Sequence, residues 1–252
     1  MRRQPIFIDL DGPLLDVKAR YHGVYASIAK ELGVTPLPMR DYWQAKRERR
    51  SLREFFPGCG DCVQLHDFYL PRWLSRIERP EWLMLDRLQR GAEECLTLLS
   101  ELYSLHLVTL RRDAAALDEQ LDWLNLRRFF TEVHSGWADG RGGALMKMSW
   151  LRPHLAAGPA AVVGDSEIDM LAARLLRVRA IGVSYGIRSE EELLELGAAQ
   201  VIHQLRDLPE AIGTCGARPR VRVRVRGDAA RIPVRQEAAR PAAAALRPAS
   251  RL

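Results

Sequence analysis

The stretch that decides the fold is Ile6-Phe7-Ile8-Asp9-Leu10-Asp11-Gly12-Pro13, near the start of the 252-residue chain. A short apolar run closed by Gly-Pro is typical of an interior parallel strand that leads into a tight turn. In open parallel sheets the ligand crevice lies beyond the carboxyl ends of the strands. We therefore predict that Asp9 and Asp11 lie in a cleft, where one carboxylate binds a cation or attacks an electrophile and the other moves a proton. The alternative is a turn without chemistry, because Asp-Gly pairs are common turn formers.

Helices and strands alternate regularly in the second half of the chain. We expect helices over 91–103, 112–124, 147–156, 167–177 and 189–196, and strands over 105–109, 131–135, 160–163, 179–183 and 200–202. This alternation favours an α/β fold, a Rossmann-like parallel sheet covered by helices on both faces. Residues 17–88 instead keep apolar side chains at helical spacing, which indicates a small α-helical cap inserted after the first strand. The predicted core therefore comprises residues 1–16 and 89–214.

The basic charge of the protein is concentrated at its C-terminal end. Residues 217–252 contain ten Arg against Asp228 and Glu237, a net charge of +8, which leaves residues 1–216 at −2 out of the total of +6. Residues 215–252 are rich in Arg, Ala and Pro and lack apolar periodicity, so we expect a disordered tail. Through its charge this tail could bind nucleic acid or anionic lipid, but we favour an extension that is nonspecific or without function.

The remaining bulk features indicate a soluble protein of a reducing compartment. No apolar run approaches the length of a membrane span, and no secretory signal follows Met1. We expect a cytoplasmic location, no membrane partner and free thiols.

Cys59, Cys62 and His66 offer three possible zinc ligands, but a structural zinc site usually has four. We favour a cap loop at 58–62 whose tip lies over the active site and shapes the substrate pocket.

Polar side chains suited to one task follow three of the predicted strands. They are Asp9 and Asp11 after the first strand, Thr109 at the end of the next, and Asp165 and Asp169 after the strand at 160–163, with Lys147 between the last two groups. Hard oxygen ligands suit Mg²⁺, a hydroxyl and an ammonium suit phosphate oxygens, and a free carboxylate can act as a nucleophile. These residue types together indicate phosphoryl transfer.

The same residues resemble the four ordered motifs of the haloacid dehalogenase (HAD) superfamily, over roughly residues 5–214. They read Asp9-Leu10-Asp11-Gly12-Pro13-Leu14-Leu15-Asp16, then Thr109, Lys147, and Gly164-Asp165-Ser166-Glu167-Ile168-Asp169. The helical insertion after the first motif resembles the cap of phosphoglycolate-phosphatase-like members. Two positions depart from the family pattern, because Pro13 replaces the commoner Thr and Leu110-Arg111-Arg112 follows Thr109 where many relatives have Asn. Substrate contacts near position 110 therefore cannot be transferred.

The resemblance implies a role for each motif residue. Asp9 would attack phosphorus to give an aspartyl-phosphate, and Asp11 would protonate the leaving alcohol and then activate water. Thr109 and Lys147 would hold the phosphoryl group. The side chains of Asp9 and Asp165, with the backbone carbonyl of Asp11, would bind Mg²⁺. Asp169 would support that metal site.

We expect from these roles a Mg²⁺-dependent phosphatase that hydrolyses a small phosphate monoester, with a small phosphorylated metabolite as its partner. The carboxyl group of Asp11 favours a phosphatase, because the dehalogenase branch resembles this pattern but has no acid at that position. One alternative is a phosphosugar mutase, which shares the first half-reaction. Another is a non-catalytic regulatory or nucleic-acid-binding protein that uses the fold as a scaffold, and its support is the Arg-rich tail.

Overall fold

The computed structural model describes residues 3–59, 62–138, 140–158 and 161–213. The predicted disorder of residues 215–252 therefore falls outside the described residues. The same holds for Gly60 and Asp61 of the cap loop, and for the side chain of Cys62, one of the three possible zinc ligands.

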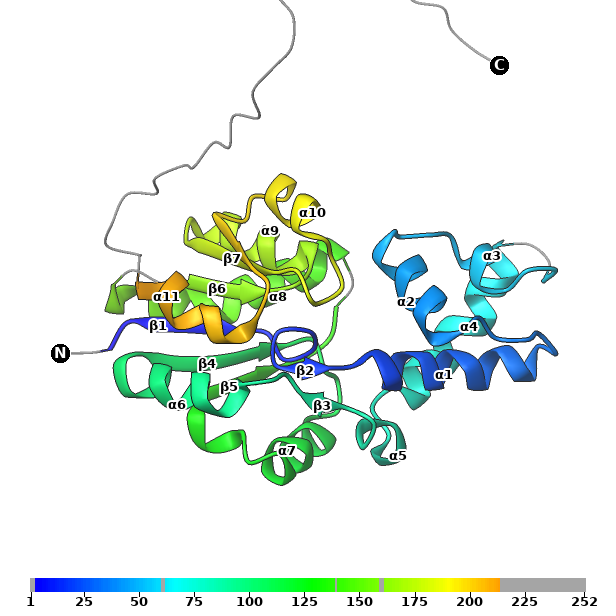
Figure 1. The fold of residues 1–252 in the computed structure, drawn as a ribbon, viewed down its shortest axis with the longest axis horizontal. Coiled ribbons are helices and arrows are strands. Elements are labelled where there is room, and N and C mark those ends of the chain that lie inside the picture. The colour runs from blue at the N-terminus through cyan, green and yellow to red at the C-terminus, as the bar shows by residue number, and fades with distance from the viewer. Residues whose placement is uncertain (1–2, 60–61, 139, 159–160, 214–252) are drawn as a thin grey trace, which may run out of the picture. The chain divides into compact units, whose positions relative to one another are not determined.

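A six-stranded parallel sheet forms the centre of the core, in the order β5-β4-β1-β6-β7-β8 (Figure 1). Its strands are β1 (Pro5–Ile8), β4 (Ser104–Thr109), β5 (Glu132–Ser135), β6 (Ala161–Gly164), β7 (Arg179–Val183) and β8 (Gln200–Ile202). The chain builds the sheet outward from β1 to β5 and then returns to the other side of β1. Ligands of open α/β sheets bind where the strand order reverses in this way, which here is the carboxyl end of β1 and β6.

Helices cover both faces of this sheet, so the predicted α/β class is confirmed. Ile6 and Ile8 of β1 point to one face and Phe7 points to the other, because successive side chains of a strand alternate. The first face packs against α6 (Ala92–Leu102), α7 (Ala114–Trp123) and α11 (Leu208–Gly213). The second packs against α8 (Gly140–Leu151), α9 (Glu167–Leu176) and α10 (Glu190–Glu195). Short 3₁₀ turns complete the core: η1 (Arg127–Phe129), η2 (Arg152–Ala157) and η3 (Leu205–Asp207).

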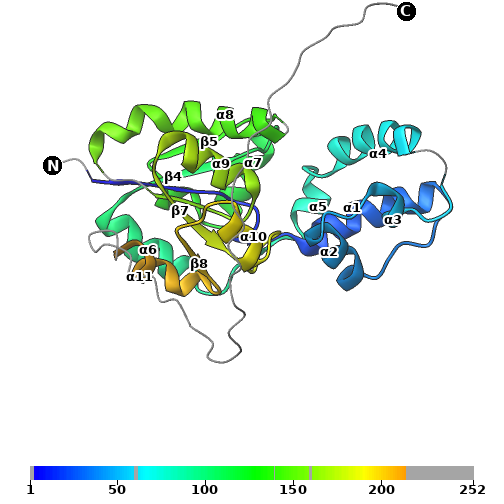
Figure 2. The same ribbon diagram turned by 90° about the horizontal axis from the view of Figure 1, so that it is seen from above.

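The segment between the first strand and α6 forms a group of helices (Figure 2). In its described residues there are five helices, which share an apolar core of their own. The helices are α1 (Lys18–Glu31), α2 (Met39–Arg47), α3 (Leu52–Phe55), α4 (Cys62–Arg76) and α5 (Pro80–Leu83). Tyr25 and Tyr42 stack at its centre with ring centroids 4.5 Å apart. The strands β2 (Leu15–Asp16) and β3 (Arg87–Leu88) pair antiparallel at the two points where the chain enters and leaves this helical segment, which we call the cap.

Three elements differ from the sequence predictions, namely α8 and the short strands β2 and β3. The helix expected over 147–156 is α8, which begins at Gly140 and ends at Leu151, and η2 follows it. A Cβ atom at Gly143 would lie 2.8 Å from the carbonyl oxygen of Ala138, so only glycine fits at this position. Glycine has a low helix propensity, and for this reason the sequence did not indicate a helix here. Strand β3 lies in a stretch expected to be wholly helical, and its two residues are too few to show alternation.

None of the helices in the described ranges is both long and apolar enough to cross a membrane.

Candidate active site

The turn after β1 brings the first motif against the loop that follows β6. The backbone N–H of Asp9 donates to the carbonyl oxygen of Val163 at 3.0 Å, which extends the strand pairing to the end of β6. Gly12 has a positive φ of 101°, and a Cβ atom there would lie 2.0 Å from the Oδ2 atom of Asp165. The glycine thus lets the backbone adopt a left-handed conformation and lets the Asp165 carboxylate approach.

Lys147 joins the first and last motifs through two short ion pairs. Its Nζ atom donates to Oδ1 of Asp9 at 2.8 Å and to Oδ1 of Asp169 at 2.7 Å. Burial alone would lower the pKa of Lys147, but the charges of Asp169 and Asp9 outweigh it and raise that pKa, so the ammonium stays charged. Asp169 also accepts a 2.6 Å hydrogen bond from Oγ of Ser166, just before α9. Both oxygens of Asp169 are therefore engaged, and this carboxylate holds Lys147 in place.

The partly buried Asp9 and the buried Asp165 and Asp169 form a group of carboxylates that fits a divalent cation. One oxygen from each lies within 4.8 Å of the others. Burial raises the pKa of Asp9 to about 7, with Lys147 opposing the shift and Asp169 adding to it. Burial and the charge of Asp9 also raise the pKa of Asp165 well above its ordinary value. Three carboxylates share one ammonium here, so a hard cation such as Mg²⁺ would balance the remaining charge.

Asp11 is held by two arginines. Arg111 donates from Nε to Oδ2 at 3.0 Å and from Nη2 to Oδ1 at 2.7 Å, while Arg20 donates from Nη2 to Oδ2 at 2.6 Å. Burial would raise the pKa of Asp11, but the two guanidinium groups outweigh it and hold that pKa well below its usual range. In this arrangement Asp11 is ionised, and its lowered pKa makes it a weak proton acceptor. Donating a proton to a leaving alcohol, the role that the resemblance implies, requires Asp11 to separate from these arginines.

A buried carboxylate, Asp86, anchors the two arginines. Arg20 donates from Nε to Asp86 Oδ1 at 3.0 Å, and Nη2 of Arg111 lies 3.5 Å from Asp86 Oδ2. Gln120 donates to the same Oδ2 at 2.8 Å. Arg20 belongs to cap helix α1 and Arg111 follows β4, so this group, which we call the arginine network, joins the cap to the core. Sequence reasoning missed Arg20 and Asp86 because no local spacing marks them, and Arg111 was visible only as a departure from the family pattern.

The predicted site residues meet at one cavity of about 250 Å³. Asp9, Asp11, Thr109, Lys147 and Asp165 line it, and Asp169 lies behind Lys147. The cap contributes aromatic walls from three helices: Tyr21 of α1, Trp43 of α2 and Trp73 of α4. Gly58 and Cys59 do not line the cavity, so among the described residues the faces of cap helices, and not the expected loop tip, shape the pocket.

Comparison with known proteins reveals similarity at the level of the fold. No protein-family model matches the sequence, and no curated protein matches it. A haloacid dehalogenase-like hydrolase from Streptococcus pneumoniae superposes with a TM-score of 0.64 at 22% identity, over 83% of this chain and 98% of that one. A predicted phosphoglycolate phosphatase from Haemophilus somnus superposes with a TM-score of 0.59 at 17% identity, over 84% of this chain and 99% of that one. A protein assigned as a β-phosphoglucomutase from Thermotoga maritima superposes with a TM-score of 0.57 at 20% identity, over 84% of this chain and 99% of that one. With its parallel sheet, its helical cap and the residues Asp9, Thr109 and Asp165 at the carboxyl ends of β1, β4 and β6, this chain has the fold of the haloacid dehalogenase superfamily.

Proposed function

We propose that the protein is a Mg²⁺-dependent phosphatase that hydrolyses a small phosphate monoester through an aspartyl-phosphate on Asp9. One observation carries the proposal: the Asp9 carboxylate lies at the carboxyl end of the central strand, with Lys147 on one oxygen and the carboxylates of Asp165 and Asp169 beside it. Neighbouring folds include hydrolases and a predicted phosphatase, which supports phosphoryl chemistry in general.

In the first step Asp9 forms a bond to phosphorus while the bond from phosphorus to the alcohol oxygen breaks. Lys147 orients Asp9 through its hydrogen bond to Oδ1 and, with the hydroxyl of Thr109, donates to oxygens of the transferring group. Bound by Asp9 and Asp165, Mg²⁺ would supply the positive charge that lets a dianionic ester approach these carboxylates. Asp169 keeps Lys147 in position.

In the second step water attacks the aspartyl-phosphate, and Asp11 accepts the proton that the water loses. Arg20 and Arg111 keep Asp11 ionised, as a base must be, but the lowered pKa makes it a weak proton acceptor, so this step also requires the guanidinium groups to move away. The leaving alcohol of the first step needs a proton, and Asp11 delivers one only after the arginines move away. Arg20 lies on cap helix α1, so a shift of the cap would release one of the two guanidinium groups.

The size and lining of the cavity restrict the substrate. Its volume of about 250 Å³ falls below the roughly 300–1,000 Å³ that is common for drug-sized ligands. The tryptophans on the cap side offer flat apolar walls, and the arginines beside Asp11 attract anions. These features favour a small phosphorylated metabolite over a macromolecule.

A panel of phosphate monoesters, assayed for phosphate release with Mg²⁺ and with a chelator, tests the proposal. We expect release from at least one small ester, loss of that release with the chelator, and its recovery when Mg²⁺ is restored. No release from any ester would favour the scaffold alternative. Transfer of the phosphoryl group to another position of a sugar, without free phosphate, would favour the mutase.

A further inference from the structure

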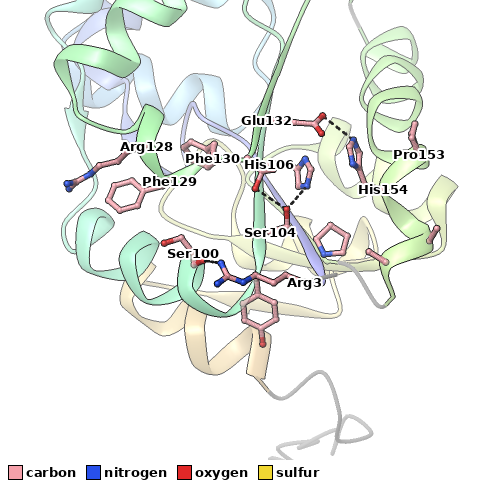
Figure 3. Close-up of a pocket in the computed structure, with 15 residues that line it drawn as sticks. Arg3, Ser100, Ser104, His106, Arg128, Phe129, Phe130, Glu132, Pro153 and His154 are labelled. Atoms are coloured by element: carbon pink, nitrogen blue, oxygen red, sulfur yellow. Dashed lines mark hydrogen bonds and ion pairs between the residues drawn. The ribbon is translucent and has the colours of Figure 1, made fainter. Parts of the chain in front are cut away.

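Four potential metal ligands meet at a second place, away from the motif residues: His106, Glu132, His134 and His154. We call this group the histidine cluster. His106 comes from β4, Glu132 and His134 come from β5, and His154 comes from η2. One nitrogen or oxygen atom from each lies within 4.8 Å of the others. Figure 3 shows three of these side chains, those of Glu132, His106 and His154, gathered at one side of a pocket.

The pocket beside the histidine cluster is separate from the candidate active site. It has a volume of about 670 Å³ and reaches Pro5 and Ser104, the first residues of β1 and β4. The motif residues lie at the other ends of these strands. His106 precedes Thr109 by three residues on β4, a separation of about 10 Å at 3.3 Å per residue.

The side chains of the histidine cluster already converge as ligands do. The carboxylate oxygen Oε2 of Glu132 lies 3.3 Å from Nε2 of His134 and 3.4 Å from Nε2 of His154. The rings of His106 and His154 have centroids 4.3 Å apart. A single carboxylate oxygen therefore already lies near two imidazole nitrogens that come from different elements.

Unsatisfied nitrogens give an independent indication of a missing ligand. His106 is 3% exposed, and its Nε2 is paired with Oγ of Ser104 at 3.1 Å, while its Nδ1 has no hydrogen-bond partner. Nε2 of His134 is also buried without a hydrogen bond, although Glu132 is near it. Buried polar atoms are normally paired, so two such nitrogens in one cluster call for an explanation. Contacts between the aromatic rings leave these two nitrogens unpaired, whereas coordination to a metal ion would pair both of them.

The ionisation state of the cluster agrees with this interpretation. Burial and the nearby His154 lower the pKa of His106 to about 4, and burial also lowers the pKa of His134. Both imidazoles are therefore neutral near pH 7, which is the form in which histidine binds metals.

We propose that the histidine cluster binds a divalent transition-metal ion, for which Zn²⁺ is the best fit. Three imidazole nitrogens and one carboxylate oxygen match the four-coordinate sites that Zn²⁺ prefers, whereas the all-carboxylate group at the active site suits Mg²⁺. Four protein ligands make a closed, structural site. The ion would fasten β5, the edge strand of the sheet, to β4 and η2.

Zinc titration of the full-length protein by calorimetry, with excess Mg²⁺ to occupy the carboxylate site, tests this proposal. We expect one Zn²⁺ per chain, and about 100-fold weaker binding for His154→Ala and at least about tenfold weaker binding for Glu132→Gln. Both changed side chains are partly exposed, so folding of the variants is checked by circular dichroism. His203→Ala is the matched control, because His203 pairs with Glu190 and Ser184 elsewhere and its loss should leave zinc affinity unchanged.

Two further readouts locate the ion. X-ray absorption should show imidazole nitrogens around the bound zinc, and Zn²⁺ should raise the melting temperature of the wild type but not of His154→Ala. Asp165→Asn and a double variant, Cys59→Ala with His66→Ala, should keep the same zinc affinity. No zinc binding, wild-type affinity in His154→Ala, or loss of affinity in either of the latter variants would overturn the proposal.

Discussion

Arg20 is a fully buried cation with two charged partners, Asp11 and Asp86, and it also donates to the carbonyl oxygen of Ile77. Removing one member of a buried ion pair leaves an uncompensated charge, which typically costs about 3–5 kcal/mol. We therefore expect Arg20→Met to lower the free energy of unfolding in urea by about that amount. Arg40→Met is the control, because Arg40 is almost fully exposed and surface changes usually stay within about 0.5 kcal/mol. A loss below about 1 kcal/mol for Arg20→Met would show that the arginine network does not stabilise the fold.

The pKa of Asp9 predicts a pH dependence of metal binding. With the pKa raised to about 7, metal-free protein keeps a proton on Asp9 below that pH, and a cation must displace it. The affinity for Mg²⁺ should therefore fall as the pH drops from 7 to 5, by about tenfold per pH unit for one proton. Calorimetry at pH 6 in two buffers of different ionisation enthalpy should reveal proton release on binding, and release should shrink at pH 8. Affinity that is flat between pH 5 and 7 would contradict the assignment of Asp9 as a ligand.

At the scale of single residues, the motif residues could be predicted from the sequence, but the residues that hold Asp11 in place could not. Asp9, Thr109 and Asp165 could be predicted because ligand-binding groups of parallel sheets follow strand ends. Lys147 lies in α8 and could be predicted only from the resemblance to the family pattern. Arg20 and Asp86 lie 66 residues apart and meet only through the tertiary fold. The histidine cluster was not predicted for the same reason, since its four residues come from three separate elements.

Cap helices α2 and α4 place Trp43 and Trp73 in the wall of the cavity. Trp73 stacks edge-on against Tyr21 with ring centroids 5.2 Å apart, so its removal would enlarge the pocket without touching the motif residues. We expect Trp73→Ala to raise kcat/KM for bulky monoesters relative to the smallest substrate by about tenfold, within the range that apolar pocket contacts confer. A size-graded series of esters measures this shift.

Two variants control for general effects of losing a tryptophan. Trp73→Phe should preserve the wild-type preference, and Trp123→Ala removes a tryptophan of α7 that is 47% exposed and lies outside the cavity lining. A uniform change in kcat/KM across the series for Trp73→Ala would mean that the cap helices do not select the substrate.

Elements with strong periodicity were predicted well, and weak ones were not. The alternation of β and α from residue 91 onward specified a parallel sheet, and that prediction is confirmed. The start of α8 was misplaced because its first turn contains Gly140, Gly142 and Gly143, which have low helix propensity. Close packing accounts for Gly143. The pairing of β2 with β3 depends on contacts between distant segments that no local pattern shows.

At the scale of the whole molecule, every motif residue and every described strand precedes residue 214. Deleting residues 217–252 removes a net charge of +8 and no group of the proposed site. We expect the truncated protein to keep its melting temperature and its turnover of a small ester, as measured side by side with the full chain. Loss of turnover would mean that the domain boundary is wrong. Weaker binding to nucleic acid alone would assign the tail an electrostatic role.

Trapping of the covalent intermediate tests the central claim most directly. Asp11→Asn should impair the second step most when the substrate is p-nitrophenyl phosphate, because that leaving group needs little protonation while water still lacks its base. In rapid-mixing experiments we predict a burst of nitrophenol equal to the enzyme concentration, and mass spectrometry should locate a phosphoryl group on Asp9. Asp9→Asn should show neither burst nor phosphoenzyme. Turnover retained in Asp9→Asn, or turnover by Asp11→Asn without a burst or a modified Asp9, would contradict the account.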